Sequence, residues 1–176
     1  MNERIEHFKW VLADLIYDLT VPAEVFREYV HKDNFSPDNL IHAGVLRMTS
    51  NALIMSLARL WEVIRYYGQE INSFPENIKQ GCNLVKKEIE DKKIYQFRSK
   101  YAAHVIDKDT KKPLSLSEGK RRYEIIVGTT IGDMNDFCSW ICPENYASHQ
   151  EYSVVKVVTD LRDHCLSIVG SSDERP

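Results

Sequence analysis

The chain has 176 residues and a formal net charge of −3, and this length fits one compact domain with a substantial core. Hydrophobic residues make up 43% and charged residues 28%, which is ordinary for a globular protein and excludes a disordered chain. The first residues, Met-Asn-Glu-Arg-Ile-Glu, contain no apolar signal core, and no apolar stretch approaches membrane-spanning length. We therefore expect a cytoplasmic protein with no membrane partner.

Apolar residues recur at spacings of three and four along nearly the whole chain, which predicts an all-α fold. A first helix is expected from Ile5 to an interruption at Thr20-Val21-Pro22, because proline breaks helical hydrogen bonding, with a short second piece to about Val30. Ser36-Pro37-Asp38 is an N-cap and first-turn signal for a long helix that ends before Gly68.

The second half of the chain continues the helical pattern. One helix is expected after Ser73-Phe74-Pro75 and another around Phe97, followed by a loop at residues 107–113. Ser115 and Glu118 have capping-box spacing and predict the start of a long helix that Pro143 ends.

A last helix is expected from Val154 to Ile168, because its apolar stripe outweighs the strand propensity of Val154–Val158. The prediction is one compact bundle of five to seven helices over residues 1–169, with a flexible tail at 170–176.

The four cysteines are expected to be reduced thiols in a cytoplasmic protein. They are Cys82, Cys138, Cys142 and Cys165. Two of them are four residues apart, but there is no matching Cys or His pair with zinc-ligand spacing. The sequence also contains no glycine-rich phosphate loop, nucleophile elbow or paired-metal carboxylate pattern. We therefore predict no metal and no cofactor.

Positive charge is concentrated between residues 86 and 122. This segment has twelve Lys or Arg against six Asp or Glu, a local balance of +6, so the remainder of the chain carries −9. Such an asymmetry would steer an anionic polymer toward this segment, where Lys93, Lys100 and Lys108 are candidate RNA-binding residues. A solvated lysine-rich helix surface is an equally good interpretation, because acidic residues are interleaved throughout.

The segment Phe97-Arg-Ser-Lys-Tyr-Ala-Ala-His104 joins a permanent cation to a proton-transfer group. Arginine can hold a phosphate through paired hydrogen bonds, while histidine exchanges protons near neutral pH. On a straight helix Arg98 and His104 would lie about 120° apart, on opposite edges of an apolar stripe. A local helix break or a two-fold dimer could gather both residues at one phosphate.

This segment, followed by Asp107-Lys108 and then Lys112-Pro-Leu-Ser-Leu116, resembles the HEPN superfamily and is most similar to its abortive-infection U-type (AbiU-like) subfamily. The resemblance implies a helical bundle and a homodimer with the motif at the interface. It also implies a metal-independent endoribonuclease in anti-phage or toxin systems, with RNA as the partner and an antitoxin or defence-system protein as a possible second one.

On this resemblance, Arg98 and His104 are the catalytic pair and Ser99 is the supporting polar residue. Members of the family more often have Asn, Asp or His at the position of Ser99, so this residue departs from the pattern. One branch has a tyrosine two residues after the histidine that a partner nucleotidyltransferase modifies. Here that position is Ile106, which disfavours this form of control.

The alternative function is a non-catalytic HEPN-type module that binds a nucleotide, RNA or a protein partner, and a third is a purely structural bundle. Ser99 and the acidic remainder of the chain favour the binding module. Glu62 could place an acid near the motif, but the spacing in Leu60-Trp-Glu-Val-Ile-Arg65 favours an ordinary pair between Glu62 and Arg65 within one helix.

Overall fold

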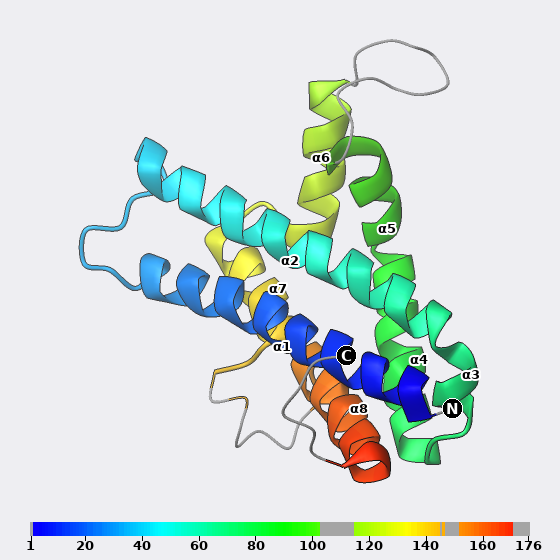
Figure 1. Ribbon diagram of the computed structural model, residues 1–176. Coiled ribbons are helices and arrows are strands. Elements are labelled where there is room, and N and C mark those ends of the chain that lie inside the picture. Colours follow the sequence, from blue (N-terminus) through cyan, green and yellow to red (C-terminus); the bar gives the residue numbers. More distant parts are fainter. Residues whose placement is uncertain (1, 103–114, 145, 147–151, 171–176) are drawn as a thin grey trace.

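The computed structural model of the chain describes residues 2–102, 115–144, 146 and 152–170. Within these ranges there are eight α-helices, one π-helical turn and no strand, so the predicted all-α class is confirmed (Figure 1). The elements are α1 (Asn2–Val30), α2 (Leu40–Tyr66), α3 (Gly68–Asn72), α4 (Glu76–Asp91), α5 (Ile94–Phe97), η1 (Arg98–Ala102), α6 (Leu116–Val127), α7 (Ile131–Ile141) and α8 (Val154–Val169). The helix count exceeds the predicted five to seven because a long helix is divided and α3 and α5 are short separate helices.

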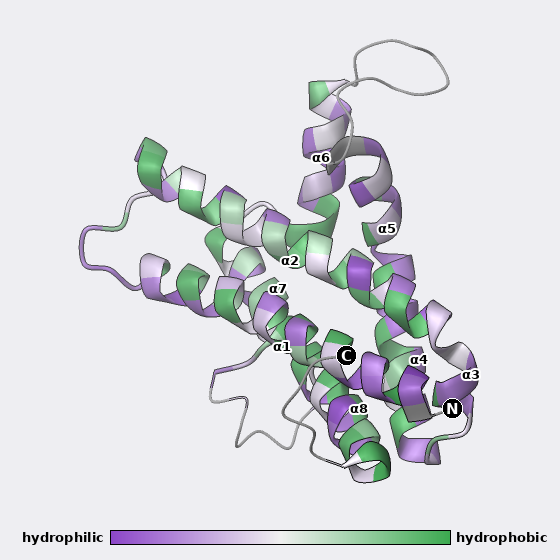
Figure 2. Cartoon of the chain, in the orientation of Figure 1, coloured by the Kyte–Doolittle hydropathy of each residue, from purple (hydrophilic) through white to green (hydrophobic). Residues whose placement is uncertain are grey.

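The centre of the fold is formed by α1, which packs against both α2 and α8 (Figure 1). Phe8, Leu12, Leu15 and Leu19 are fully buried at spacings of three and four, so the apolar stripe of the first helix faces the core as predicted. Hydrophobic residues are spread along these three helices, whereas the loop joining α1 and α2 is mainly hydrophilic (Figure 2).

The predicted break at Pro22 is wrong, because α1 continues through this residue without ending. Proline has no N–H, so the carbonyl of Asp18, four residues earlier, loses its helical donor. Ser56 on α2 replaces it by donating from Oγ to the Asp18 carbonyl at 3.1 Å. Beyond the proline, Ala23 and Phe26 are fully buried, which holds the last turns of α1 against the core.

Replacing Ser56 by alanine is expected to lower the free energy of unfolding by about 1–3 kcal/mol, because the Asp18 carbonyl loses its replacement donor. The same change should cost less in a Pro22→Ala background, where the alanine N–H can reach that carbonyl. Urea unfolding of the double-mutant cycle measures the difference. Equal costs in the two backgrounds would show that Ser56 does not compensate for the proline.

The N-cap of the long helix α2 lies three residues later than Ser36, the predicted N-cap. Asn39 is the N-cap, and its side chain accepts hydrogen bonds from the backbone N–H groups of Ile41 and His42. The backbone N–H of Ser36 instead donates to Nδ1 of His42 at 3.0 Å. An Asn side chain caps the free N–H groups of a first helical turn as well as a Ser side chain does. Ser36 and Asn39 are therefore both suitable N-cap residues by type, and the structure uses Asn39.

By length and composition, α2 is also apolar enough to cross a membrane, which the sequence pattern did not predict. Of its most apolar window, 39% is buried inside the fold. The buried residues of α2 belong to the same core as those of α1 and α8. A central core helix is expected to have this composition.

The predicted long helix ending at Pro143 is divided into α6 and α7, so this prediction is also wrong. Gly128 ends α6 with a positive φ of 92°, a conformation that favours glycine. Thr130 then begins α7 with a capping box, in which its Oγ1 accepts from the Asp133 N–H and Asp133 Oδ2 accepts from the Thr130 N–H. Asp133 also accepts from the Thr129 N–H, and these backbone donors lower the pKa of its carboxyl.

Other predicted elements agree with the structure. The helix expected after Ser73-Phe74-Pro75 is α4, and Val154–Val158 is helical as part of α8. Ser115 is the N-cap of α6, as predicted, and its Oγ accepts from the Glu118 N–H at 3.3 Å. Residue 170 ends α8, while the rest of the expected tail and the expected loop at 107–113 lie outside the described residues.

Candidate functional site

Arg98 lies at the start of the π-helical turn η1, directly after the short helix α5. Ile94 and Phe97 are buried and fix α5 against the core, as the apolar stripe predicted. Lys93, which precedes α5, has a φ of 57°, a left-handed conformation that is uncommon for a residue other than glycine. The motif therefore begins at a local break in helical geometry, and such π turns occur frequently at functional sites.

The Arg98 side chain is paired across the fold with Glu62 on α2. Its Nη1 donates to Glu62 Oε1 at 3.2 Å, and the two side chains are 34% and 42% exposed. The expected pair between Glu62 and Arg65 is thus replaced by a contact between two helices. Arg65 lies over the ring of Trp61 instead, with its guanidinium carbon 4.5 Å from the ring centroid.

The other predicted site residues are only partly brought together. Ser99 is next to Arg98 on the π turn, and its Oγ donates to the backbone carbonyl of Gln96 at 3.2 Å. Lys93 and Lys100 are exposed before and within the same turn. His104 and Lys108 lie outside the described residues, so the meeting of Arg98 and His104 in one cleft stays a prediction.

An aromatic cleft adjoins Arg98. Trp61, Glu62, Arg65 and Tyr66 of α2 and Tyr95 of α5 line a depression of about 340 Å³, which we call the aromatic cleft. The Trp61 and Tyr95 rings are tilted by 31°, with centroids 4.4 Å apart. The sequence indicates only that Trp61 and Arg65, four residues apart, lie on the same side of a helix. The cleft also needs Tyr95, which is 34 positions away from Trp61 and could not be paired with it from the sequence.

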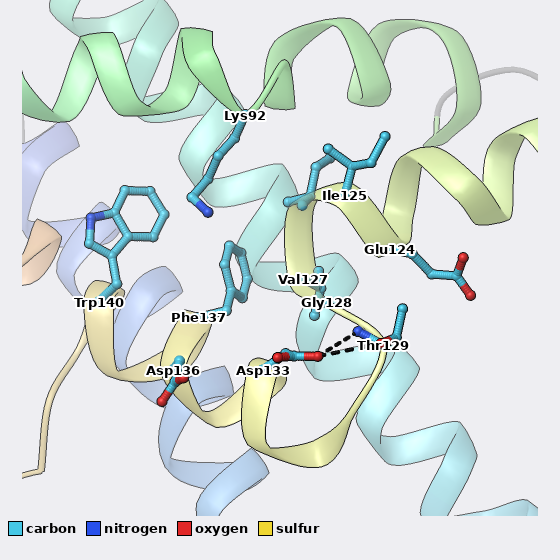
Figure 3. Close-up of a pocket in the computed structure, with 11 residues that line it drawn as sticks. Lys92, Glu124, Ile125, Val127, Gly128, Thr129, Asp133, Asp136, Phe137 and Trp140 are labelled. Atoms are coloured by element: carbon cyan, nitrogen blue, oxygen red, sulfur yellow. Dashed lines mark hydrogen bonds between the residues drawn. The ribbon is translucent and has the colours of Figure 1, made fainter.

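A larger cavity of about 480 Å³ lies between the end of α4 and the helices α6 and α7 (Figure 3). Its charged lining consists of Glu124, Asp133 and Asp136 against Lys92. Lys92 and Trp140 lie on the same side of this cavity, with the ammonium nitrogen 5.5 Å from the ring centroid. A lining with three carboxylates and one ammonium group disfavours a phosphate there, so this cavity is a poorer candidate for RNA than the aromatic cleft.

The positive segment is partly neutralised on α6. Glu118 accepts hydrogen bonds from Arg121 at 2.9 Å and from Arg122 at 2.6 Å, and these two cations lower the pKa of its carboxyl to about 2. Lys120 is also paired on this helix, with Glu124 at 3.7 Å, so three of the twelve cationic residues between 86 and 122 have ion-pair partners within α6. Around α5 and η1, Lys93 and Lys100 are exposed on either side of Arg98, and this region is the better candidate for an anion-binding surface.

The cysteines are buried free thiols. Burial raises the pKa of Cys82, Cys138 and Cys165 to about 12, so these side chains are neutral near pH 7 and unsuited to nucleophilic attack. In the part of the chain that the structure describes, no three His, Cys, Asp or Glu side chains form a possible metal site.

Comparisons with known proteins give one informative result. No family model matches the chain, and no curated protein matches it. The fold is similar to that of a solved integron cassette protein, Vpc_cass2, from the mobile metagenome of V. paracholerae. The TM-score is 0.75 at 20% sequence identity, and the match covers 94% of this chain and 97% of that protein. At this identity the similarity shows the fold alone.

Proposed function

We propose that this protein is a HEPN-type, metal-independent endoribonuclease that acts as an anti-phage abortive-infection or toxin component. Arg98 and His104 are the catalytic residues of this proposal, and two copies of the chain form the site. The proposed family rests on the resemblance of the segment from Phe97 to His104 to the HEPN superfamily. The position of Arg98 in the structure supports the proposed role of this residue.

The observation that carries the proposal is the presentation of Arg98 at a break in the helix. One third of its side chain is exposed, and it lies between the exposed Lys93 and Lys100 in the sequence and next to the aromatic cleft in space. The bond to Glu62 uses one of the five N–H donors of the guanidinium. A planar cation held in this way can receive a phosphate through its other donors.

An exposed apolar stripe on α2 supports the proposed homodimer. Ile41, Met48 and Met55 are seven residues apart on this helix and are 68%, 62% and 39% exposed. Residues at this spacing lie on one side of a helix, and the next residue in the series is Glu62, the partner of Arg98. A second copy packed along this stripe would therefore extend the interface to the proposed site.

The proposed reaction transfers a phosphoryl group within the RNA strand. His104 of one copy takes the proton from a ribose 2′-hydroxyl, and the 2′-oxygen attacks the neighbouring phosphorus. The bond from phosphorus to the 5′-oxygen breaks, and that oxygen receives a proton from the second His104. Arg98 stabilises the negative charge on the phosphorane oxygens. The products are a 2′,3′-cyclic phosphate end and a 5′-hydroxyl end.

A second candidate function is the non-catalytic HEPN-type binding module. The hydrogen bond between Arg98 and Glu62 favours it, because a structural ion pair is a complete explanation for a half-buried arginine. Ser99 donates its hydroxyl to the local backbone, which also fits a role in shaping the turn. Binding of RNA without any cleaved product would identify this function.

The full-length protein is expected to cleave single-stranded RNA in the presence of EDTA, to leave DNA intact and to sediment with the mass of two chains. Mass spectrometry of the RNA fragments should detect 2′,3′-cyclic phosphate ends. His104→Ala is expected to abolish cleavage with an unchanged melting temperature. Equal cleavage by wild type and His104→Ala would contradict the proposal, as would cleavage of DNA at the rate of RNA.

A further inference from the structure

We propose that the aromatic cleft binds one nucleobase of a single-stranded RNA, next to the phosphate held by Arg98, and that Glu62 selects a base with an exposed amino group. This inference rests on the proposed function, because Arg98 is its anchor. It adds a specificity-determining site that the Arg98 and His104 motif does not contain. The cleft volume of about 340 Å³ lies within the range of about 300–1,000 Å³ that is usual for small-ligand sites.

The rings of the cleft are held in place before any ligand arrives. Trp61 donates from Nε1 to Glu90 Oε1 at 2.8 Å and contacts the Tyr95 ring on a neighbouring helix. Arg65 lies over the indole, with its guanidinium carbon 4.5 Å from the ring centroid. The exposed Arg65 guanidinium presents a flat surface on which a base can stack, and the indole beneath it is already held, so little side-chain freedom remains to be lost on binding.

Tyr66 supplies the accessible ring of the cleft. It is 66% exposed although it is a large hydrophobic residue that lines a concave surface. Its ring meets that of the buried Tyr67 edge to face, with centroids 4.9 Å apart, and the guanidinium carbon of Arg4 is 4.9 Å from its centroid. These contacts orient a ring that remains open to solvent, as a stacking residue for a base must be.

Glu62 joins the cleft to the proposed phosphate site, because it lines the cleft and accepts a hydrogen bond from Arg98. A carboxylate has about four lone-pair positions, so Glu62 can accept further donors while it holds the guanidinium. Cytosine and adenine present an amino group, and guanine presents an amino group beside a ring N–H, which matches two carboxylate oxygens. Uracil has no amino group and is expected to bind least well.

The charges favour the aromatic cleft over the larger cavity as a site for a nucleic-acid strand. Glu62 lies between Arg65 within the cleft and Arg98 beside it, and Glu90 accepts a hydrogen bond from Trp61, so two guanidinium groups balance two carboxylates. The cavity near Trp140 has an excess of negative charge, with three carboxylates and one lysine. An RNA strand can therefore place a base in the aromatic cleft and a phosphate at Arg98 without facing uncompensated carboxylates.

Binding of RNA hexamers to full-length His104→Ala in EDTA tests this inference separately from cleavage. Tryptophan fluorescence and anisotropy should show that a guanine-containing hexamer binds about tenfold more tightly than oligo(U). Tyr66→Ala is expected to weaken binding about 5- to 100-fold, in line with the loss of one base stack. Tyr17→Ala is the matched control, because Tyr17 is 69% exposed on α1 and does not line the cleft.

Three further variants identify the site and the selecting residue. Fluorescence quenching by RNA should disappear in Trp61→Phe and persist in Trp140→Phe. Glu62→Gln should reduce the preference for guanine over uracil, whatever its effect on overall affinity. Equal binding by the Tyr66 and Tyr17 variants, or an unchanged base preference in Glu62→Gln, would overturn the inference even if the wild type cleaves RNA. Selective binding without cleavage by the wild type would support it and reject the nuclease.

Discussion

Replacing Arg98 by alanine is expected to slow RNA cleavage by about 10²–10³-fold, because the variant lacks the proposed cation that stabilises charge on the phosphate. The same change should alter the free energy of unfolding by less than about 1 kcal/mol. The reason is that the pair between Arg98 and Glu62 is 34% and 42% exposed, and exposed ion pairs contribute little to stability. Single-turnover rates on end-labelled RNA and urea unfolding measure the two effects.

Arg59 on α2 provides a matched control for this experiment. Arg59 of α2 donates to Asp18 of α1 at 2.8 Å, and both side chains are 45% exposed. Arg59→Ala therefore removes a similar surface ion pair without touching the motif. It should have a similar small effect on stability and leave the cleavage rate unchanged. A comparable loss of activity in both variants would point to general electrostatics and contradict a specific role for Arg98.

Arg98→Lys distinguishes the two candidate functions. Lysine keeps the charge but lacks the planar pair of donors, so a catalytic Arg98 should not be rescued fully by this change. For a binding module, the lysine variant should retain most of the RNA affinity, and none of the proteins should release a product. The rate and the affinity must therefore be measured on the same preparations.

The all-α class and several helices could be predicted because they depend on local sequence. The periodic burial of Phe8, Leu12, Leu15 and Leu19 follows directly from their spacing. In Val154–Val158 the strand propensity is overruled by an apolar stripe that continues along α8. Where the apolar spacing, the capping residues and the helix-breaking residues agree over three or more turns, the secondary structure can be predicted without knowledge of tertiary contacts.

Pro22 shows why one break was predicted wrongly. Within α1 alone an interior proline removes a helical hydrogen bond, but Ser56, 34 positions away, supplies the missing donor. That contact exists only after α1 and α2 have packed together. No spacing rule within α1 could reveal it.

The candidate site also has a part that could be predicted from the sequence and a part that depends on helix packing. Arg98 was found because its motif is contiguous in the sequence. Its hydrogen bond to Glu62 joins η1 to α2 across 36 positions, and the ring contact between Trp61 and Tyr95 joins α2 to α5 across 34 positions. These contacts turn a sequence motif into a surface with a cleft, and they arise from helix packing rather than from local pattern.

Replacing Gly128 by alanine is expected to lower the free energy of unfolding by about 1–3 kcal/mol from backbone strain alone. Gly128 has a φ of 92°, and an added Cβ would lie 2.0 Å from the Cβ of Asp133 and 2.7 Å from its Cγ. Relief of this clash must displace Asp133, which accepts hydrogen bonds from the backbone of Thr129 and Thr130. The variant should therefore lose the capping box as well as the turn between α6 and α7.

Gly132→Ala is the matched control, because the nearest heavy atom to its added Cβ is Thr130 Oγ1 at an ordinary 3.5 Å. Gly132 lies within α7, where alanine should be neutral or stabilising by about 0.5–1 kcal/mol. Urea unfolding should thus show a loss of stability for Gly128→Ala and no loss for Gly132→Ala. Similar effects for the two glycines would contradict a special role for the turn at Gly128.

The pH dependence of the Gly128→Ala effect reports on Asp133. Backbone donors lower the folded-state pKa of this carboxyl, so its contribution to stability is present above the unfolded-state value and is lost as the pH falls through the lowered one. If Gly128→Ala displaces Asp133, the difference in stability between wild type and variant should be larger at pH 7 than near pH 2. A difference that does not change with pH would assign the whole effect to backbone strain and leave the capping box intact. In either case, the break between α6 and α7, which the apolar periodicity did not predict, requires glycine at position 128, because Asp133 fills the space that a Cβ would take.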